Sequence, residues 1–541
     1  MRLQSFRCAW LASLVCVCPA TSRAQITHHV NVDSNGIALD SGSVPAITAN
    51  GRFVAWAGNP NVYVRDRWQG TAAIASVTVS GTSPSYACVS PSISNDGRFV
   101  AFESFSPNLV SGDTNGVRDI FVRDMLNGTT EIASLGLGGA LANSDCVWPS
   151  MSADGRYVLF VSNATNLVSG PSGRAYLRDR TNGTTTMVYP QSAGSPISIS
   201  LSGNGRYLLL CTTDNGLVNP DNNGASDILV RDLQVGTYQI VSRGIGGAQS
   251  NGGSGAPAIS SDGRFVAFES YATNLVAGDT NGARDVFVRD RQTGTTLLAS
   301  ANNVGAQNPV YDPGSCSISR DGRYVTFVWN NQLYRFDRIA LTEVLVSVNT
   351  AGVVGDGSSS QASLGDNGDF IAFNTAAHNM LPLVSFGGLF VRDFTVSCPM
   401  PQLYCTTKVN SYNCTPTMWA DGVPSLSNFN DFYVAAFGLV HQTNGLLFYG
   451  SAQAATPFFG GTLCVQPPVA RLPVQNTGGG PPSFPGACNG QYLLHFDHTF
   501  MAAHNITAGT MLCMQFWGRD PGFAAPNNVQ LTDGLQFTTC P

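Results

Sequence analysis

Short hydrophobic runs that follow an Asp-Gly turn recur along most of the chain. Residues 91–102 read PSISNDGRFVAF, and residues 257–268 read PAISSDGRFVAF. Asp-Gly favours a hairpin because glycine tolerates positive φ, and β-forming residues without polar alternation are typical of a strand buried on both faces. No long amphipathic helix pattern interrupts these runs. The pattern therefore predicts an all-β chain of antiparallel hairpins.

The hairpin unit repeats at a nearly regular interval. The turn glycine recurs at seven positions, which are Gly51, Gly97, Gly155, Gly205, Gly263, Gly322 and Gly368. Each glycine is followed by a second signature of the Val-Arg-Asp type, such as Val122-Arg123-Asp124. Because a propeller blade takes about 40–50 residues, the spacing predicts a seven-bladed β-propeller. The repeated arginines and aspartates are interpreted as structural, forming turns and pairing between strands.

The two ends of the repeat array predict how the ring closes. The seventh unit stops at Phe394 and runs into Cys398-Pro399, without a turn and a fourth strand. Residues 27–36 resemble residues 342–352, which form the fourth strand of unit six. The N-terminal strand is therefore expected to complete the last blade, which would remove exposed sheet edges.

Three recurring motifs carry a resemblance to a known family. They are Ser-x-Asp-Gly-Arg-Phe/Tyr-Val-Ala-Phe, Gly-Asp-Thr-Asn-Gly and Asp-Ile-Phe-Val-Arg-Asp, and they occur in order within residues 25–397. In these motifs the chain resembles the TolB-like, WD-type propeller repeats of exported bacterial proteins. The resemblance implies a propeller that is used for binding or as a scaffold.

Residues 398–541 have a different composition. They contain seven cysteines, which are Cys398, Cys405, Cys414, Cys464, Cys488, Cys513 and Cys540. Short β-rich runs alternate with Gly/Pro loops, which predicts a disulfide-rich β-sandwich or jelly-roll-like domain. Because the number of cysteines is odd, one is free or pairs with the propeller half. Segments such as Tyr404-Cys405-Thr406 resemble a cysteine-rich terminal module of secreted bacterial proteins.

The N-terminus and the charge balance bear on where the protein acts. Residues 1–24 are typical of a signal peptide, with Arg2 and Arg7 before an apolar run that is too short to span a bilayer. We therefore expect a secreted or periplasmic protein with disulfides and no membrane span. The formal net charge is −6, which argues against a protein that binds nucleic acid by neutralising phosphates. A monomer is expected.

One loop type offers oxygen ligands that suit calcium. The three copies of the loop supply Asp113, Asn115 and Asp119; Asp221, Asn223 and Asp227; and Asp279, Asn281 and Asp285. Carboxylate and amide oxygens around a glycine are ligands that Ca²⁺ prefers, although the bidentate glutamate of an EF-hand is missing. The alternative, which the pattern favours, is a tight turn in which these side chains bond their own backbone. Calcium is the only cofactor that the sequence suggests.

Other candidate chemistry is weaker. His495, His498 and His504 have a spacing that occurs in metal sites, but residues three apart on a strand point to opposite faces. The Gly-x-Ser-x-Gly elbow of hydrolases is not completed at residues 252–256, because Ala256 stands in the last position. Cys88 and Cys146 each lie nine residues before a turn glycine. An inter-blade disulfide and two packed thiols both remain open.

No catalytic motif is complete, and two functions from different classes remain. The favoured one is a secreted, non-enzymatic binding or scaffold protein that uses a propeller face to bind a protein, a glycan or a cell-surface ligand. The alternative is a hydrolase acting on glycans or lactones, with its active site at the central channel. Acidic residues or histidines gathered at one mouth of the channel would favour the enzyme.

Overall fold

β-Strands make up almost all of the regular structure. The structure is a computed structural model, and it describes residues 26–32, 39, 42–169, 173–190, 196–218, 221, 223–301, 316–349, 352–380, 387–395, 401–421, 424, 426, 432–478 and 488–539. The only α-helix in these ranges is α1 (His498–Ala503). No helix in the described part of the chain is long and apolar enough to cross a bilayer. The predicted signal peptide, residues 1–24, lies outside the described residues.

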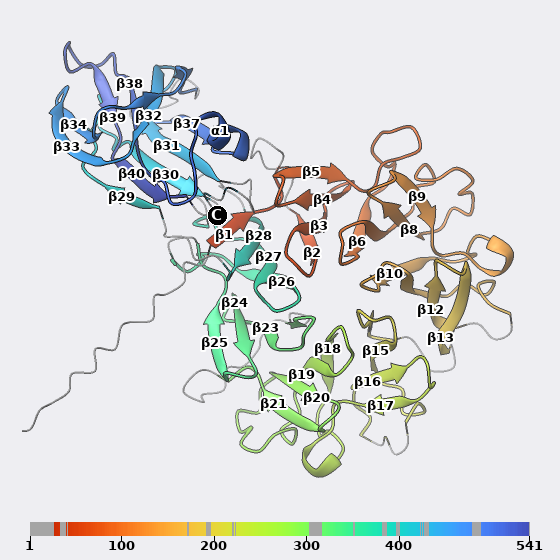
Figure 1. Ribbon diagram of the computed structural model, residues 1–541. Coiled ribbons are helices and arrows are strands. Elements are labelled where there is room, and N and C mark those ends of the chain that lie inside the picture. The colour runs from red at the N-terminus through yellow and green to blue at the C-terminus, as the bar shows by residue number, and fades with distance from the viewer. Residues whose placement is uncertain are drawn as a thin grey trace, which may run out of the picture.

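Seven antiparallel sheets of four strands each occupy the described part of the N-terminal three quarters of the chain. Repeats one to six use consecutive strands: β2–β5 (Ser43–Ile47, Phe53–Ala57, Val62–Asp66, Thr71–Ile74), β6–β9 (Cys88–Ile93, Phe99–Ser104, Asp119–Asp124, Thr129–Ile132), β10–β13 (Cys146–Met151, Tyr157–Ser162, Gly173–Asp179, Thr184–Pro190), β14–β17 (Ser198–Leu201, Tyr207–Thr212, Asp227–Asp232, Tyr238–Ile240), β18–β21 (Ser254–Ile259, Phe265–Ser270, Asp285–Asp290, Thr295–Leu298) and β22–β25 (Ser317–Ile318, Tyr324–Trp329, Gln332–Asp337, Thr342–Leu345). Short 3-10 turns occur at Leu137–Gly139 and Ile245–Gly247. The sheets lie around a common centre, with β2, β6, β10, β18 and β26 toward the centre (Figure 1).

Repeat seven combines the two ends of this region. Its strands are β26 (Ser359–Leu364), β27 (Phe370–Thr375), β28 (Gly388–Asp393) and β1 (Ile26–His29). Strand β1 pairs antiparallel with β28, so that the N-terminal strand lies at the outer edge of the last sheet. The hydroxyl of Thr27 donates to the carbonyl of Val348 at 2.6 Å, and Arg392 Nη1 donates to Thr27 Oγ1 at 2.7 Å.

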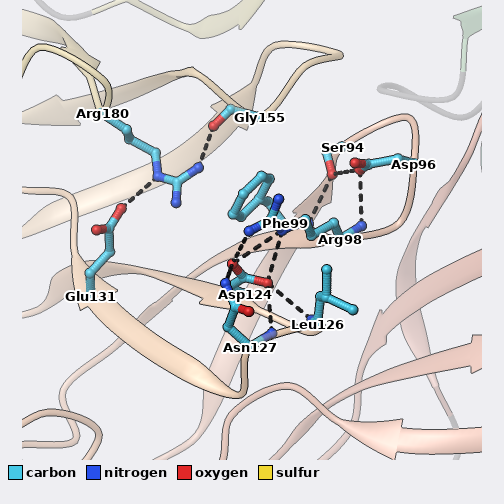
Figure 2. Close-up of polar contacts among 10 residues, drawn as sticks. All are labelled: Ser94, Asp96, Arg98, Phe99, Asp124, Leu126, Asn127, Glu131, Gly155 and Arg180. Atoms are coloured by element: carbon cyan, nitrogen blue, oxygen red, sulfur yellow. Dashed lines mark hydrogen bonds and ion pairs between the residues drawn. The ribbon is translucent and has the colours of Figure 1, made fainter.

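The two sequence signatures of each repeat meet in one hydrogen-bonded unit. In repeat two, Asp96 Oδ1 accepts from the hydroxyl of Ser94 and from the backbone N–H of Arg98, which fixes the turn (Figure 2). Arg98 Nη2 lies 2.7 Å from Asp124 Oδ2, and Asp124 Oδ1 accepts from the backbone N–H of Leu126 at 3.0 Å. The same pairing occurs at Arg52–Asp66, Arg156–Asp179, Arg206–Asp232, Arg264–Asp290 and Arg323–Asp337. The structural interpretation of these residues is confirmed in six repeats.

Neighbouring repeats are coupled through the turn glycines. A Cβ added to Gly97 would lie 2.2 Å from the Phe53 ring of the preceding repeat, and Gly97 has a φ of 74°. The equivalent contacts are Gly155 on Phe99, Gly205 on Tyr157, Gly263 on Tyr207, Gly322 on Phe265, Gly368 on Tyr324 and Gly51 on Phe370. The last contact joins repeat one to repeat seven. Arg180 reinforces the contact of repeats two and three, because it donates to the Gly155 carbonyl and pairs with Glu131 (Figure 2).

The C-terminal region has its own sheets and its own core. Its strands are β29 (Gln402–Tyr404), β30 (Thr417–Asp421), β31 (Tyr433–Leu439), β32 (Asn444–Gly450), β33 (Gln453–Phe458), β34 (Gly461–Val465), β35 (Ala470–Arg471), β36 (Gln475–Asn476), β37 (Gly490–His495), β38 (Met511–Arg519), β39 (Val529–Leu531) and β40 (Gly534–Thr538). One sheet runs in the order β29-β40-β38-β32-β35, and a second is β30-β31-β37. Apolar side chains of both sheets, including Val434, Tyr492, Phe516 and Phe537, form one buried cluster.

The cysteines resolve into bonded and free groups. Cys405 is bonded to Cys464, and Cys414 to Cys488. Cys513 is a buried free thiol, while Cys398 and Cys540 lie outside the described residues. Cys88 and Cys146 are both buried free thiols, so the packed-thiol alternative holds for this pair.

Candidate functional site

The inner strands of five repeats share an uncommon backbone feature. A non-glycine residue with positive φ interrupts the pairing of β2, β6, β10, β18 and β26, and these residues are Val44, Ser90, Trp148, Ala256 and Gln361. Left-handed backbone is unfavourable for residues with a Cβ, and such positions persist where surrounding structure holds them, often at functional sites. They therefore direct attention to the common centre around which the seven four-stranded sheets lie, and we call these sheets the ring.

At the junction of repeats two and three, a buried carboxyl group holds two of these bulges. Glu103 lies on β7 and is 3% exposed. Its Oε2 accepts from the backbone N–H of Trp148 at 2.8 Å, and its Oε1 accepts from Ser90 Oγ at 3.3 Å. Arg118 Nη1 lies 3.5 Å from the same Oε1. Glu103 thus joins inner strands of adjacent sheets.

The environment of Glu103 favours its neutral form. Burial raises its pKa, and the nearby charge of Asp145 raises it further. The Trp148 N–H bond and the Arg118 charge act in the opposite direction, but the net shift is upward. The exposed Asp145 accepts from the backbone N–H of Arg118 at 3.1 Å. Arg118 thus contacts both a buried and an exposed carboxyl group.

Exposed aromatic rings surround this group. The guanidinium carbon of Arg118 lies 4.7 Å from the centre of the Phe105 ring, and Tyr86 meets Phe105 edge-on at 6.5 Å. Phe105, Tyr86 and Trp148 are 39%, 59% and 45% exposed. Large exposed rings next to a buried ionisable group are characteristic of binding surfaces rather than of a packed core.

Repeat five contains a second copy of this arrangement. The fully buried Glu269 pairs with Arg284, whose guanidinium lies 5.9 Å from the ring centre of the exposed Tyr271. Nearby, the Cys316 thiol donates to the Ala256 carbonyl at 2.7 Å, and burial together with the charge of Glu269 raises the pKa of Cys316. The other repeats carry Ala57, Val161, Cys211, Val328 and Asn374 at this position.

The sequence interpretation missed Glu103 and Glu269. Both lie inside the apolar run that follows the turn, where a charged residue breaks the pattern in only these two of seven repeats. The arginines that pair with these glutamates, Arg118 and Arg284, also stand at equivalent positions of the two repeats. Each precedes the aspartate that opens the next strand. The glutamate and the arginine that only these two repeats share could have identified the site. This difference is overlooked when the repeats are treated as equivalent.

The structure brings together the side chains within each predicted calcium loop. Asn115 Nδ2 donates to Asp119 Oδ2 at 2.7 Å, and Asn115 Oδ1 accepts from the Val117 N–H at 3.3 Å. Burial, together with the charge of Asp113, raises the pKa of Asp119 to about 6. The loop thus combines a backbone turn with two buried carboxyl groups that repel each other.

The other two loops repeat this geometry on separate sheets. Asn223 Nδ2 donates to Asp227 Oδ2 at 3.1 Å, and the charge of Asp221 adds to the burial that raises the Asp227 pKa. In the third loop, burial raises the pKa of Asp285. The charge of Asp279 raises this pKa further, and the hydrogen bond with Asn281 lowers it. Within the described ranges, no three His, Cys, Asp or Glu side chains form a metal-binding group. Calcium at these loops stays a prediction.

The C-terminal histidines occupy different elements. His495 ends β37 and stacks on Tyr433 with ring centres 4.4 Å apart. His498 begins α1, because Asp497 caps this helix by accepting from the Phe500 N–H at 2.6 Å. The two histidines therefore lie on a strand and on a helix, not on a single strand. His504 Nδ1 lies 2.8 Å from the Phe500 carbonyl oxygen.

Comparison with known proteins gives structural likeness without a family. No protein-family model and no curated protein matches the chain. An oligogalacturonate lyase from Vibrio parahaemolyticus aligns with a TM-score of 0.42 and 11% identity, over 68% of this chain and 91% of the lyase. The hydrazine synthase of Kuenenia stuttgartiensis aligns with a TM-score of 0.37 and 11% identity, over 64% of this chain and 94% of that one.

These findings correct the favoured functional expectation. The sequence analysis preferred a non-enzymatic binding or scaffold protein, whereas the first of these structures is an enzyme by its name. We do not propose the non-enzymatic interpretation again, and we judge the enzymatic alternative on the residues of this chain. Because the likeness is distant, the case for that alternative rests on the residues around Glu103. The TolB-like resemblance and that of the cysteine-rich module stay predictions, since no family model matches.

Proposed function

We propose that the protein is a secreted hydrolase that acts on glycans, with its active site around Glu103 where repeats two and three meet. The observation that carries this proposal is the buried Glu103 carboxyl group, with its raised pKa, beside the exposed Asp145 carboxylate and a group of exposed aromatic rings. Hydrolysis of a glycosidic bond commonly uses two carboxyl groups, one protonated and one ionised. Their environments must push their pKa values apart.

Glu103 has the properties of the general acid. Its burial keeps the proton on the carboxyl group at a higher pH than usual, so that it can protonate the oxygen of the leaving sugar. Asp145, which is exposed, would act on the other side of the bond by activating water or by attacking the anomeric carbon. The net reaction adds one water across the glycosidic bond and regenerates both carboxyl groups.

The neighbouring residues suit a glycan better than a lactone. Aromatic rings offer apolar faces that stack on the apolar faces of sugar rings, and Tyr and Trp add a polar group at the ring edge for the sugar hydroxyls. The exposed Phe105 and Tyr86 rings contact each other, and the exposed Trp148 belongs to the bulge whose N–H Glu103 accepts. The half-buried Arg118, stacked on Phe105, adds a fixed donor for substrate oxygens.

The proposed architecture places this site between two neighbouring blades of a propeller. In it, residues 25–397 form a seven-bladed propeller closed by β1, and residues 398–541 form a separate β-sandwich module. The pairing of β1 with β28 and the contact of Gly51 with Phe370 support closure. The disulfides support an extracellular or periplasmic location after removal of residues 1–24.

The test is hydrolysis of a panel of neutral and acidic polysaccharides by the full mature chain, followed by release of reducing ends. Glu103→Gln keeps an acceptor for the Trp148 N–H and removes the proton donor, so kcat should fall by about 10²–10⁴-fold. Asp145→Asn should also lower kcat. Activity should decline as the pH rises through the pKa of Glu103, because the acid form is required.

The matched control is Glu131→Gln, which changes an exposed carboxylate on the outer strand of the same sheet and should leave kcat unchanged. Full activity in Glu103→Gln would refute the assignment of the acid. Products with an unsaturated sugar end would contradict hydrolysis, because they indicate elimination.

A further inference from the structure

The C-terminal region contains an apolar cavity that is independent of the proposed active site. Hairpin β33–β34 lies on the side of this region away from the ring of sheets (Figure 1). Between this hairpin and strands β32, β35 and β38 there is a cavity of about 580 Å³. Its walls include Phe448, Phe458, Leu463, Val469 and Trp517. A volume of roughly 300–1,000 Å³ with apolar walls is typical of sites for small organic molecules.

The walls of this cavity are held in place by covalent and buried polar contacts. The Cys405–Cys464 disulfide ties β34 to the start of the region. The fully buried Gln515 side chain on β38 accepts from the Cys464 N–H at 2.9 Å and donates to the Thr462 carbonyl at 2.9 Å. The hairpin is thus fixed over the sheet before any ligand binds, which lowers the entropic cost of binding.

One charged side chain lines the cavity. Arg471 is the only ionisable residue among the lining residues, and it makes no ion pair within the described part of the chain. It is held beside Phe448 by the pairing of β35 with β32, and it is exposed to solvent. A guanidinium presents paired N–H donors that match the two oxygens of a carboxylate or sulfonate.

We propose that this cavity binds a small amphipathic organic anion, with an apolar body against the aromatic and aliphatic walls and its acid group on Arg471. A sugar suits the cavity poorly. Its hydroxyl groups would lose water against the aliphatic Leu463 and Val469 without gaining partners, which costs free energy. A cation with the same apolar body is disfavoured because the positive charge of Arg471 repels it.

The experiment compares three eight-carbon probes that carry different head groups. Octanoate, octanol and octylammonium are titrated calorimetrically into the full, oxidised chain. Octanoate should bind most tightly, about tenfold more tightly than octanol, which corresponds to one charge-assisted contact. Octylammonium should bind most weakly.

Two substitutions separate the head-group contact from the cavity. Arg471→Gln should remove the advantage of octanoate and leave octanol binding unchanged. Val469→Trp fills the cavity and should weaken both probes. The matched control is Arg519→Gln, which removes an exposed arginine on β38 outside the cavity lining and should change neither affinity.

Three results with the unmodified chain would overturn the proposal. They are equal affinity for octanoate and octanol in the unmodified chain, the absence of binding by octanoate, and competition with octanoate by neutral monosaccharides. An equal loss of octanoate binding in Arg519→Gln and Arg471→Gln would also overturn it, because the effect would then come from general charge. None of these results depends on whether Glu103 is catalytic.

Discussion

The ring of sheets and the C-terminal region are both all-β, but they are held together by different contacts. In the ring, six of the seven sheets are built from strands that follow one another in sequence, the seventh adds β1 to β26–β28, and six Arg–Asp pairs repeat the same local unit. In the C-terminal region, β29 pairs with β40, so Gln402 lies opposite Gln536 across most of the segment. Two disulfides occur there, and none occurs among the described residues of the ring.

The difference follows from chain entropy. A repeat array buries its core between neighbours, so most of its contacts close only a short loop, and the pairing of β1 with β28 is the exception. The C-terminal region must instead bring distant segments together, and the entropic cost of closing a loop rises with its length. Cross-links across 59 and 74 residues reduce the freedom of the unfolded chain and offset that cost.

The largest expected effect is that of removing a disulfide. Replacing Cys405 and Cys464 together by alanine should lower the free energy of unfolding of the C-terminal region by about 2–5 kcal/mol and leave the unfolding of the ring unchanged. Denaturant unfolding with fluorescence detects both transitions. If the two transitions shift together, the two regions do not differ in the proposed way.

The second effect tests the coupling between neighbouring repeats. Gly97→Ala places a Cβ against the Phe53 ring at a φ of 74°, and overpacking of this kind costs about 1–3 kcal/mol beyond the backbone strain. Gly116→Ala is the matched control, since Gly116 has a φ of 67° and nothing lies within 4 Å of the added Cβ. Equal destabilisation of the ring by both substitutions would show that the aromatic contact contributes nothing.

A third effect should be confined to the ring, if its loops bind calcium. Asp113, Asp221 and Asp279 belong to loops with buried carboxyl groups, and a cation would relieve their repulsion. At tenfold excess over Kd, calcium should stabilise the ring by about 1.4 kcal/mol for each loop that it occupies, and a chelator should reverse this. Replacing all three aspartates by alanine should abolish the response in thermal melts. A response of the C-terminal region alone would contradict the prediction.

The smallest effect concerns acid stability. The Arg98 side chain, together with backbone N–H donors, holds the pKa of Asp124 at about 2, below the value of about 3.9 in an unfolded chain. The stability from this depressed pKa is present above about pH 4 and is lost as the pH falls toward about 2. Asp124→Asn should therefore make the ring less sensitive to pH in this window.

Arg98→Gln removes the main cause of the low pKa and should flatten the same part of the pH profile. Melts of the ring at a series of pH values give the comparison. An unchanged profile in both variants would show that the repeated ion pair is not responsible for the acid sensitivity of the ring.

The candidate site shows where prediction from sequence ended. The sequence indicates that acidic residues or histidines at one mouth of the channel would favour an enzyme, but it does not identify those residues. Glu103 and Trp148 are 45 positions apart, and they meet only because two sheets pack side by side and a bulge turns the Trp148 N–H toward the neighbouring sheet. The spacing of the cysteines likewise does not determine which of them pair.

The amino-acid sequence by itself determined the turns, the strands and the pairing of each arginine with its aspartate. These features depend on contacts close in the chain, such as the bond from the Phe99 N–H to the Ser94 hydroxyl, and on glycine at positions of positive φ. Tertiary structure alone decided which residues meet between sheets, where Arg471 lies relative to an apolar cavity, and that His498 begins a helix. The reason is that convergence of distant side chains depends on how sheets pack and where their pairing is interrupted, and no local pattern encodes that geometry.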